Sequence, residues 1–155
     1  MIHFELVTPE RVLYKQDVDA VTLPTTMGEV TMYPDHAPLV ATLVPGVARI
    51  THKDLEEDIA VSGGFIEMRA GSNLRVLADT AERGHELDLT VIEKARIRAE
   101  QVMREAINQN DAAYAHAAAA MERELARYKV ARKHHAGRGV PMLDRSSLPH
   151  DENPT

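Results

Sequence analysis

The sequence contains no cysteine. Disulfides, thiolate nucleophiles and cysteine-ligated zinc or iron–sulfur sites are therefore excluded. No run of about 18 apolar residues is present that would span a membrane as a helix, and the first five residues, MIHFE, lack the basic flank and apolar stretch of a secretory signal. We therefore expect a soluble chain that associates with a membrane only through a partner.

An excess of positive charge is also missing, because the formal net charge over 155 residues is -6. General affinity for nucleic acid needs clustered Lys and Arg, so it is not expected. The charge is unevenly distributed: residues 1–88 carry 15 acidic and 7 basic side chains, and residues 89–155 carry 9 acidic and 11 basic ones. The length allows one domain or a domain with a smaller appendage, and the charge predicts different neighbours for the two parts.

Up to about residue 80, short apolar runs are separated by turn-forming residues, which is typical of an all-β unit. Several runs alternate apolar and polar side chains, as in Phe65-Ile66-Glu67-Met68, so one face is predicted to be buried and the other wet. Nine short strands in about 80 residues indicate a sandwich or flattened barrel. The predicted strands are 4–8, 12–15, 18–23, 28–32, 41–43, 47–52, 58–61, 65–69 and 74–78.

From about Asp88 the pattern becomes helical, with no Gly or Pro before Gly137. A short polar linker, residues 108–111, predicts an antiparallel hairpin of two helices, with Asp111 capping the second. The alanine-rich contact buries little area per residue, so the hairpin is expected to open easily. The two predicted seams are Ile92, Ala95, Ala99, Val102 and Ala106, and Tyr114, Ala118, Met121, Leu125 and Tyr128.

These patterns divide the chain into three predicted parts. Residues 1–86 form the β domain, residues 87–136 form the helical hairpin, and residues 137–155 form a flexible tail rich in Gly, Pro, Ser and charge.

No residue pattern predicts catalysis, a metal or a cofactor. Neighbours on an extended chain point to opposite sides, so Asp35 and His36 are poorly placed as an acid–base pair. Gly63-Gly64 has no following Lys-Ser or Lys-Thr, and a bulge or tight hairpin is expected there instead of a phosphate cradle. His134-His135 diverge by about 100° on a helix, which makes a poor metal site, and residues 56–58 are expected at a hairpin tip.

The second helix ends in basic residues opposed only by Glu122 and Glu124 over residues 122–133. Two interpretations stay open. The cations either complement the helix dipole or form a basic strip that docks on an acidic protein surface. These basic residues are Arg123, Arg127, Lys129, Arg132 and Lys133.

Three segments ahead of the helical hairpin, MGEVTMYPDHAPLVATLVPGVARI, VSGGFIEM and VLADTAERGHELD, together resemble the epsilon subunit of bacterial F-type ATP synthases, over about residues 2–135. The resemblance implies a flattened sandwich of about ten strands followed by an antiparallel two-helix hairpin. It also implies a non-catalytic rotor component at the cytoplasmic face of the bacterial inner membrane. In that family the sandwich binds the gamma subunit and the membrane c-ring, and the hairpin can rise to press its basic helix on acidic loops of the catalytic alpha and beta subunits, which blocks ATP hydrolysis.

By the same resemblance, Glu29 and His36 fall in the ring-contacting loop, although Thr31 and Asp35 stand where the family usually has Gly. Arg123 and Arg127 fall where family members carry arginines, which favours the docking interpretation and extends it to Lys129 and Arg132.

Some members of the family bind ATP through Leu or Ile, Asp, two variable residues, Arg and Ala. Here the stretch runs Leu87-Asp88-Leu89-Thr90-Val91-Ile92, so the arginine position holds Val91, which cannot pair with nucleotide charge. Weak or no ATP binding is therefore expected.

Two rival functions remain testable against the resemblance. One is a free β-sandwich binding module that dimerises through its hairpin. The other is a small hydrolase that uses Asp35 and His36.

Overall fold

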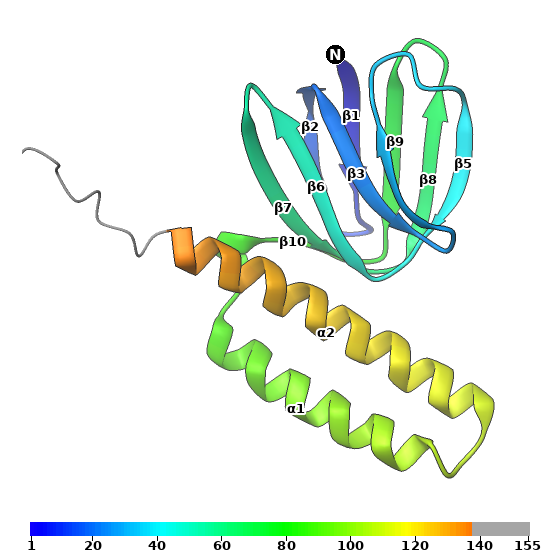
Figure 1. The fold of residues 1–155 in the computed structure, drawn as a ribbon, viewed down its shortest axis with the longest axis vertical. Coiled ribbons are helices and arrows are strands. Elements are labelled where there is room, and N and C mark those ends of the chain that lie inside the picture. The colour runs from blue at the N-terminus through cyan, green and yellow to red at the C-terminus, as the bar shows by residue number, and fades with distance from the viewer. Residues whose placement is uncertain (138–155) are drawn as a thin grey trace, which may run out of the picture.

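The computed structural model describes residues 1–137, so most of the predicted flexible tail, residues 138–155, lies outside the described residues. A ten-strand β-sandwich is followed by a short 3-10 turn and two helices (Figure 1). The strands are β1 (Ile2–Val7), β2 (Val12–Val18), β3 (Ala20–Thr25), β4 (Gly28–Met32), β5 (Leu39–Leu43), β6 (Gly46–His52), β7 (Leu55–Val61), β8 (Gly64–Arg69), β9 (Asn73–Ala78) and β10 (Ala81–Arg83). The turn is η1 (Gly84–Glu86), and the helices are α1 (Leu89–Ala106) and α2 (Asp111–Gly137).

The strands form one continuous sheet that folds into two layers. Its order is β10-β7-β6-β3-β5-β8-β9-β1-β2, with β4 paired to β3. A single residue pair, Thr25 with Leu43, joins the β3 side to the β5 side. All the strand pairs are antiparallel except β1 with β9, which run parallel. This order confirms the sandwich predicted from the short apolar runs.

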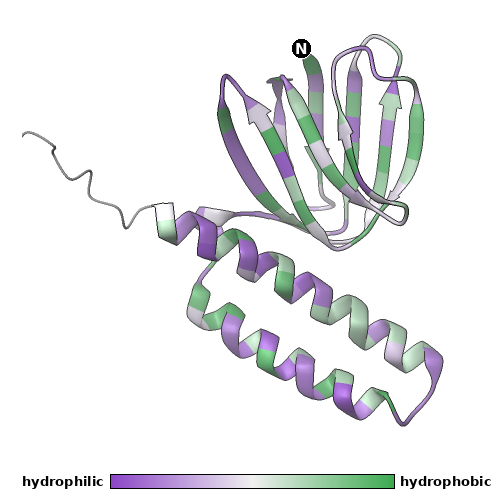
Figure 2. Cartoon of the chain, in the orientation of Figure 1, coloured by the Kyte–Doolittle hydropathy of each residue, from purple (hydrophilic) through white to green (hydrophobic). Residues whose placement is uncertain are grey.

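The core lies between the two layers because alternate side chains point inward along each strand. In β9 every second residue is buried, starting with Leu74, and β1 buries Ile2, Phe4 and Leu6. Figure 2 shows the same alternation as hydrophobic and hydrophilic bands along the strands.

Three predictions about the sandwich are wrong in detail. The expected strand 18–23 is two strands, since the chain turns at Asp19, whose carboxylate accepts a hydrogen bond from the Lys53 amide at 2.8 Å. Residues 56–58 lie within β7, and the hairpin tip is Lys53 and Asp54, both with positive φ. Gly63 and Gly64 form neither a bulge nor a tight hairpin: Gly63 lies in the link from β7 to β8, which do not pair with each other, and Gly64 is the first residue of β8.

Strand β10 was not predicted because it has only three residues, and its pairing with β7 stabilises it.

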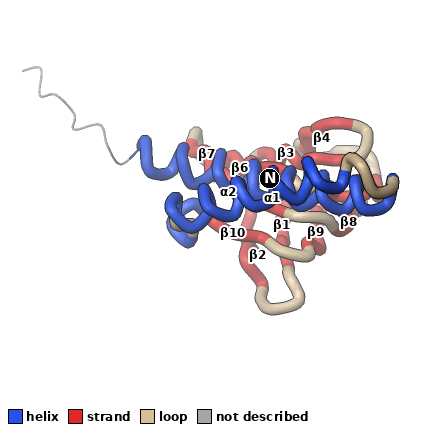
Figure 3. The backbone as a smooth tube through the Cα atoms, turned by 90° about the horizontal axis from the view of Figure 1, so that it is seen from below, coloured by secondary structure: helices blue, strands red, loops and turns tan. Residues whose placement is uncertain are grey.

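The predicted helical hairpin is present, and α2 lies between α1 and the sandwich (Figure 1). Seen from below, the two helices lie in front of the strands (Figure 3). Asp88 caps α1, because its carboxylate accepts hydrogen bonds from the Thr90 and Val91 amides at 2.8 and 3.2 Å. The cap of α2 is Asn110 rather than the predicted Asp111, since the Asn110 side chain accepts from the Ala113 amide at 2.8 Å.

The predicted seams are only partly right. Val102 is 54% exposed, and the half-buried residue at that level of α1 is Met103. Tyr114 is also exposed. The patterns assumed that each helix faces only the other, whereas α2 also faces the sandwich and buries Ala126, Val130 and Ala131, of which Val130 and Ala131 join a small cluster with strand residue Ala60.

Candidate interaction surfaces

The predicted ring-contact residues are separated along β4. Glu29 is exposed near the start of the strand and lines a groove of about 390 Å³ with Lys129 of α2. His36 is half-buried in the loop after the strand, and its Nδ1 lies 2.8 Å from the Ala37 carbonyl. Glu29 therefore lies near the start of β4, and His36 lies in the loop beyond its end.

The loop holds Asp35 in a backbone conformation that glycine adopts most readily. Asp35 has φ 62°, a left-handed conformation that aspartate tolerates better than most residues. Its amide donates to Ser72 Oγ at 2.8 Å. The described hydrogen bonds of Asp35 and His36 thus go to Ser72, Ala37 and Tyr33, not to each other.

The predicted basic residues of α2 do not share one face. Arg127 points toward the sandwich, whereas Arg132 is exposed. Five residues turn through about 500° at 3.6 residues per turn, so the two side chains leave the helix about 140° apart. Arg123 and Lys129 are also exposed. Their role in docking stays a prediction.

Arg127 is held by two carboxylates. Its Nε and Nη2 donate to both oxygens of Glu82 at 2.7 and 3.0 Å, and its Nη1 donates to Glu124 at 2.9 Å. Burial alone would lower the pKa of Arg127, but the two carboxylates outweigh it and the net shift of the pKa is upward. The guanidinium is therefore firmly charged, and its donors are taken up within the chain.

The residues of the degenerate nucleotide motif have structural roles. Leu87 and Ile92 are buried against α2 and the sandwich. Asp88 is the cap of α1, and Val91 is exposed. The motif positions therefore build the junction between the two parts of the chain. Within residues 1–137, no group of three or more His, Asp or Glu side chains is placed to hold a metal ion.

An apolar surface that the sequence analysis did not single out crosses strands β8, β9 and β1. Phe65 and Leu77 pair across β8 and β9, and Leu77 pairs with Val7 of β1. Phe65 is 61% exposed and Leu77 is 48% exposed. We call Phe65, Leu77 and Val7 the apolar stripe. The signal was available, because Phe65 shares the wet face of its strand with Glu67.

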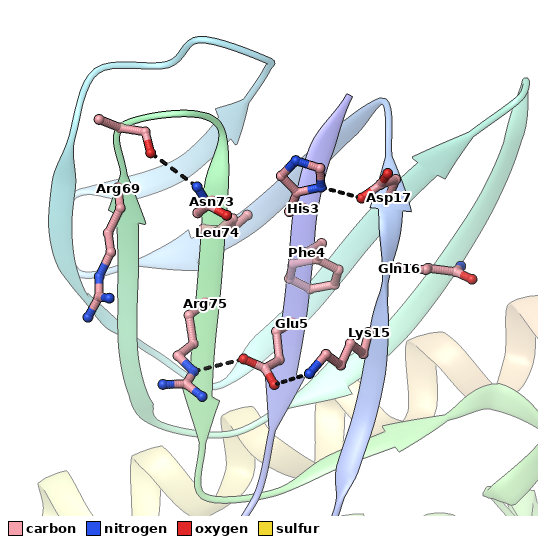
Figure 4. Close-up of a pocket in the computed structure, with 11 residues that line it drawn as sticks. His3, Phe4, Glu5, Lys15, Gln16, Asp17, Arg69, Asn73, Leu74 and Arg75 are labelled. Atoms are coloured by element: carbon pink, nitrogen blue, oxygen red, sulfur yellow. Dashed lines mark hydrogen bonds and ion pairs between the residues drawn. The ribbon is translucent and has the colours of Figure 1, made fainter.

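A ladder of charges crosses β9, β1 and β2 (Figure 4). It lies on the same sheet face as the apolar stripe, because Glu5 and Val7, and likewise Arg75 and Leu77, are two residues apart on their strands. Glu5 accepts from Arg75 at 2.9 Å and lies 3.7 Å from Lys15. His3 and Asp17 pair at 2.5 Å further along the strands. These residues line a hollow of about 590 Å³. Helix α2 packs on the other layer, against β6, β7 and β10, so the hairpin leaves this face open.

The helices of residues 1–137 offer no candidate membrane span, as each is too short or too polar.

The fold and these surfaces define a class of two-part proteins, in which a β-sandwich carries a helical hairpin docked on one of its layers. Residues 1–84 match the family model described as "ATP synthase, Delta/Epsilon chain, beta-sandwich domain". The chain belongs to this family, as one of its epsilon chains.

Relatives cover most of the chain. The ATP synthase epsilon chain of Herpetosiphon aurantiacus is 40% identical over 131 residues, which is 84% of this chain and 94% of the relative. That of Chloroflexus aggregans is 42% identical over 133 residues, covering 86% and 94%.

Among solved structures, a chain of the Euglena gracilis mitochondrial ATP synthase OSCP/F1/c-ring complex has the same fold. Its TM-score is 0.67 at 21% identity, with 88% of this chain and 81% of that chain covered. A chain of the Tetrahymena thermophila mitochondrial ATP synthase central stalk/c-ring structure gives a TM-score of 0.59 at 17% identity, covering 84% and 96%.

Proposed function

We propose that this chain is a non-catalytic rotor subunit of an F-type ATP synthase, which couples rotation of the membrane c-ring to the gamma subunit. The observation that carries the proposal is the match to epsilon chains at about 40% identity over most of both lengths. The solved chains with the same fold come from mitochondrial ATP synthase assemblies that include the central stalk or the c-ring, which agrees with the proposal. The chain then works as a peripheral subunit at the cytoplasmic face of the bacterial membrane.

The apolar stripe is the surface that binds gamma. A large exposed apolar patch marks a protein contact in soluble proteins. Burying a Phe or Leu side chain fully is favourable by about 1.5–3 kcal/mol, so completing the burial of Phe65 and Leu77 contributes about 1–2 kcal/mol each. The charged ladder beside the stripe then sets orientation more than affinity.

A pull-down with the cognate gamma subunit tests this assignment. The double variant Phe65→Ser, Leu77→Ser loses binding by about 30-fold or more, since each 1.4 kcal/mol is tenfold. Leu55→Ser is the matched control, because Leu55 is also exposed but lies on β7. Equal retention of gamma by the double variant and the control removes the stripe from the interface. Failure of the unaltered chain to bind gamma removes the rotor proposal itself.

The c-ring contact is made by Glu29 and His36. Both are accessible at least in part, but Glu29 lies near the start of β4 and His36 in the loop after it, so they contact different parts of the ring surface. If the contact is correct, a single cysteine introduced at position 29 or 36 cross-links to purified c-ring. The cross-link is specific to that position because the native chain has no cysteine. A cysteine at position 12, on β2, is the exposed control.

The hairpin, residues 87–136, is the regulatory part, and residues 1–86 form the binding platform. Opened from the sandwich, α2 presents its basic side chains to acidic loops of the catalytic alpha and beta subunits and blocks ATP hydrolysis. Deleting residues 88–155 raises hydrolysis by the complete complex, and deleting 138–155 alone is the matched control. Unchanged hydrolysis after the longer deletion refutes the inhibitory role and leaves the coupling role standing.

A further inference from the structure

The contact between α2 and the sandwich combines a small apolar cluster with ion pairs. The apolar part is a small cluster around Val130 and Ala131. Around this cluster, Arg127 forms a bidentate ion pair with Glu82 of β10, and Lys133 donates a hydrogen bond to Asp58 of β7 at 2.8 Å. Both cations sit on the half of α2 nearest its C-terminal end, where the helix crosses β7 and β10.

The Arg127 pair is well suited to hold a helix in place. Both oxygens of Glu82 are engaged by separate nitrogens of one guanidinium, a geometry that fixes orientation as well as distance. The two side chains are 24% and 30% exposed. Glu124 is buried beneath them and pairs with the same guanidinium at 2.9 Å. Charge pairs of this burial are screened less by salt than exposed ones.

A steric fit adds to the charge pairs. Helix α2 passes so close to η1 that a Cβ added to Gly84 would lie 2.6 Å from the Cβ of His134. Only a glycine leaves room for the helix at this point. The close packing of α2 against η1 therefore helps to place Arg127 and Lys133 beside Glu82 and Asp58.

We infer that the sandwich carboxylates Glu82 and Asp58 compete with the acidic surface of a partner for Arg127 and Lys133, so that the closed hairpin sequesters the cations that docking requires. We call these two pairs the internal latch. The docking half of this inference rests on the proposed function, whereas the latch itself is a property of the isolated chain. Arg123, Lys129 and Arg132 stay exposed in the closed form. Because Arg123 lies 3.6 Å from Glu124, Lys129 and Arg132 are the cations best placed to make the first contact with an acidic partner.

The test uses the full chain with a spin label on each part. Because the sequence has no cysteine, cysteines at exposed Val40 and His116 label the sandwich and α2 selectively. Pulsed electron–electron double resonance then measures the distance between the two labels, and the distance distribution gives the populations of closed and open hairpin. Glu82→Gln keeps the size of the side chain and removes its charge, and we expect about a tenfold rise in the open-to-closed ratio, the factor that corresponds to about 1.4 kcal/mol.

The matched control is Glu5→Gln. Glu5 is likewise a paired strand carboxylate, bound by Arg75 at 2.9 Å, but it lies on β1, away from the hairpin. An unchanged ratio in Glu82→Gln, or an equal change in Glu5→Gln, overturns the latch.

The complete complex separates the latch from the proposed inhibition. With the latch weakened, Glu82→Gln is expected to lower ATP hydrolysis, since more hairpins are open to dock. If the label distances shift but hydrolysis does not change, the latch stands and the inhibitory role of the hairpin fails.

Discussion

Replacing Ile92 with alanine tests whether the hairpin and the sandwich are separate units of stability. Ile92 is 1% exposed and packs with Leu87, Val130 and strand residue Ala60 in a cluster distinct from the sandwich core. Ile→Ala in a buried site costs about 2–5 kcal/mol, and the cost is highest where neighbours cannot collapse into the space. Two of the cluster's five members are alanines on fixed backbone, so we expect about 3 kcal/mol.

Amide hydrogen exchange measures this loss segment by segment. A loss of about 3 kcal/mol lowers protection about 100-fold, and the loss is expected in α1 and α2 only. Amides of β1, β8 and β9 keep their protection because the main core is intact. Val91→Ala is the matched control, since the neighbouring Val91 side chain is exposed and its truncation changes protection by less than about twofold.

Equal loss of protection in the sandwich and the hairpin would refute this reasoning. It would mean that the small cluster and the main core unfold as one cooperative unit, and that opening of the hairpin requires unfolding of the platform.

Three further predictions concern strain, pH and nucleotide. Gly64→Ala lowers the free energy of unfolding measured in urea by more than about 3 kcal/mol, because its Cβ would lie 2.0 Å from the Leu77 carbonyl oxygen. Gly28→Ala is the control, since Gly28 also has a positive φ but faces open space, and it costs only about 1–2 kcal/mol of backbone strain. Equal losses in the two variants would contradict the steric account. The hydrogen bond from Arg11 lowers the pKa of Glu86 below its ordinary 4.5, so the pair stabilises the fold above about pH 4.5, and this stabilisation is lost as the pH falls through the lowered pKa. The difference in free energy of unfolding between the native chain and Glu86→Gln is therefore expected to shrink on acidification. A constant difference from pH 7 to pH 3 would contradict this prediction. Isothermal titration with MgATP gives no micromolar binding, and a micromolar dissociation constant would reverse the interpretation of the degenerate motif.

The sequence predicts those features that repeat locally. Strand β9 alternates buried and exposed residues along its whole length, and the prediction of 74–78 matches it within one residue. The helical hairpin follows from a long stretch without Gly or Pro and a short polar linker. Features set by a single local contact were less predictable, since Asn110 and Asp111 are both acceptable caps and only the backbone geometry selects Asn110.

The candidate surfaces were harder to predict because they depend on pairs distant in sequence. Nothing near Arg127 indicates that Glu82 lies against it, because β10 is too short to show a pattern. Spacing placed Arg127 and Arg132 together as basic residues, but the packing of α2 on the sandwich turns one inward and leaves the other exposed. The alternation along β8 puts Phe65 on the same face as Glu67, and the significance of a phenylalanine there emerges once Leu77 is seen beside it.

The parallel pairing of β1 with β9 sets an order on events during translation. Residues 2–7 leave the ribosome before their second neighbour, residues 73–78, and the seven strands from β2 to β8 are made in between. Until then β1 has an open edge, and its inward side chains Ile2, Phe4 and Leu6 lack half of their lining. A nascent chain halted before β9 therefore exposes an unpaired, aggregation-prone strand edge to neighbouring chains on the polysome. The sandwich can be completed only late, after β9 has been made.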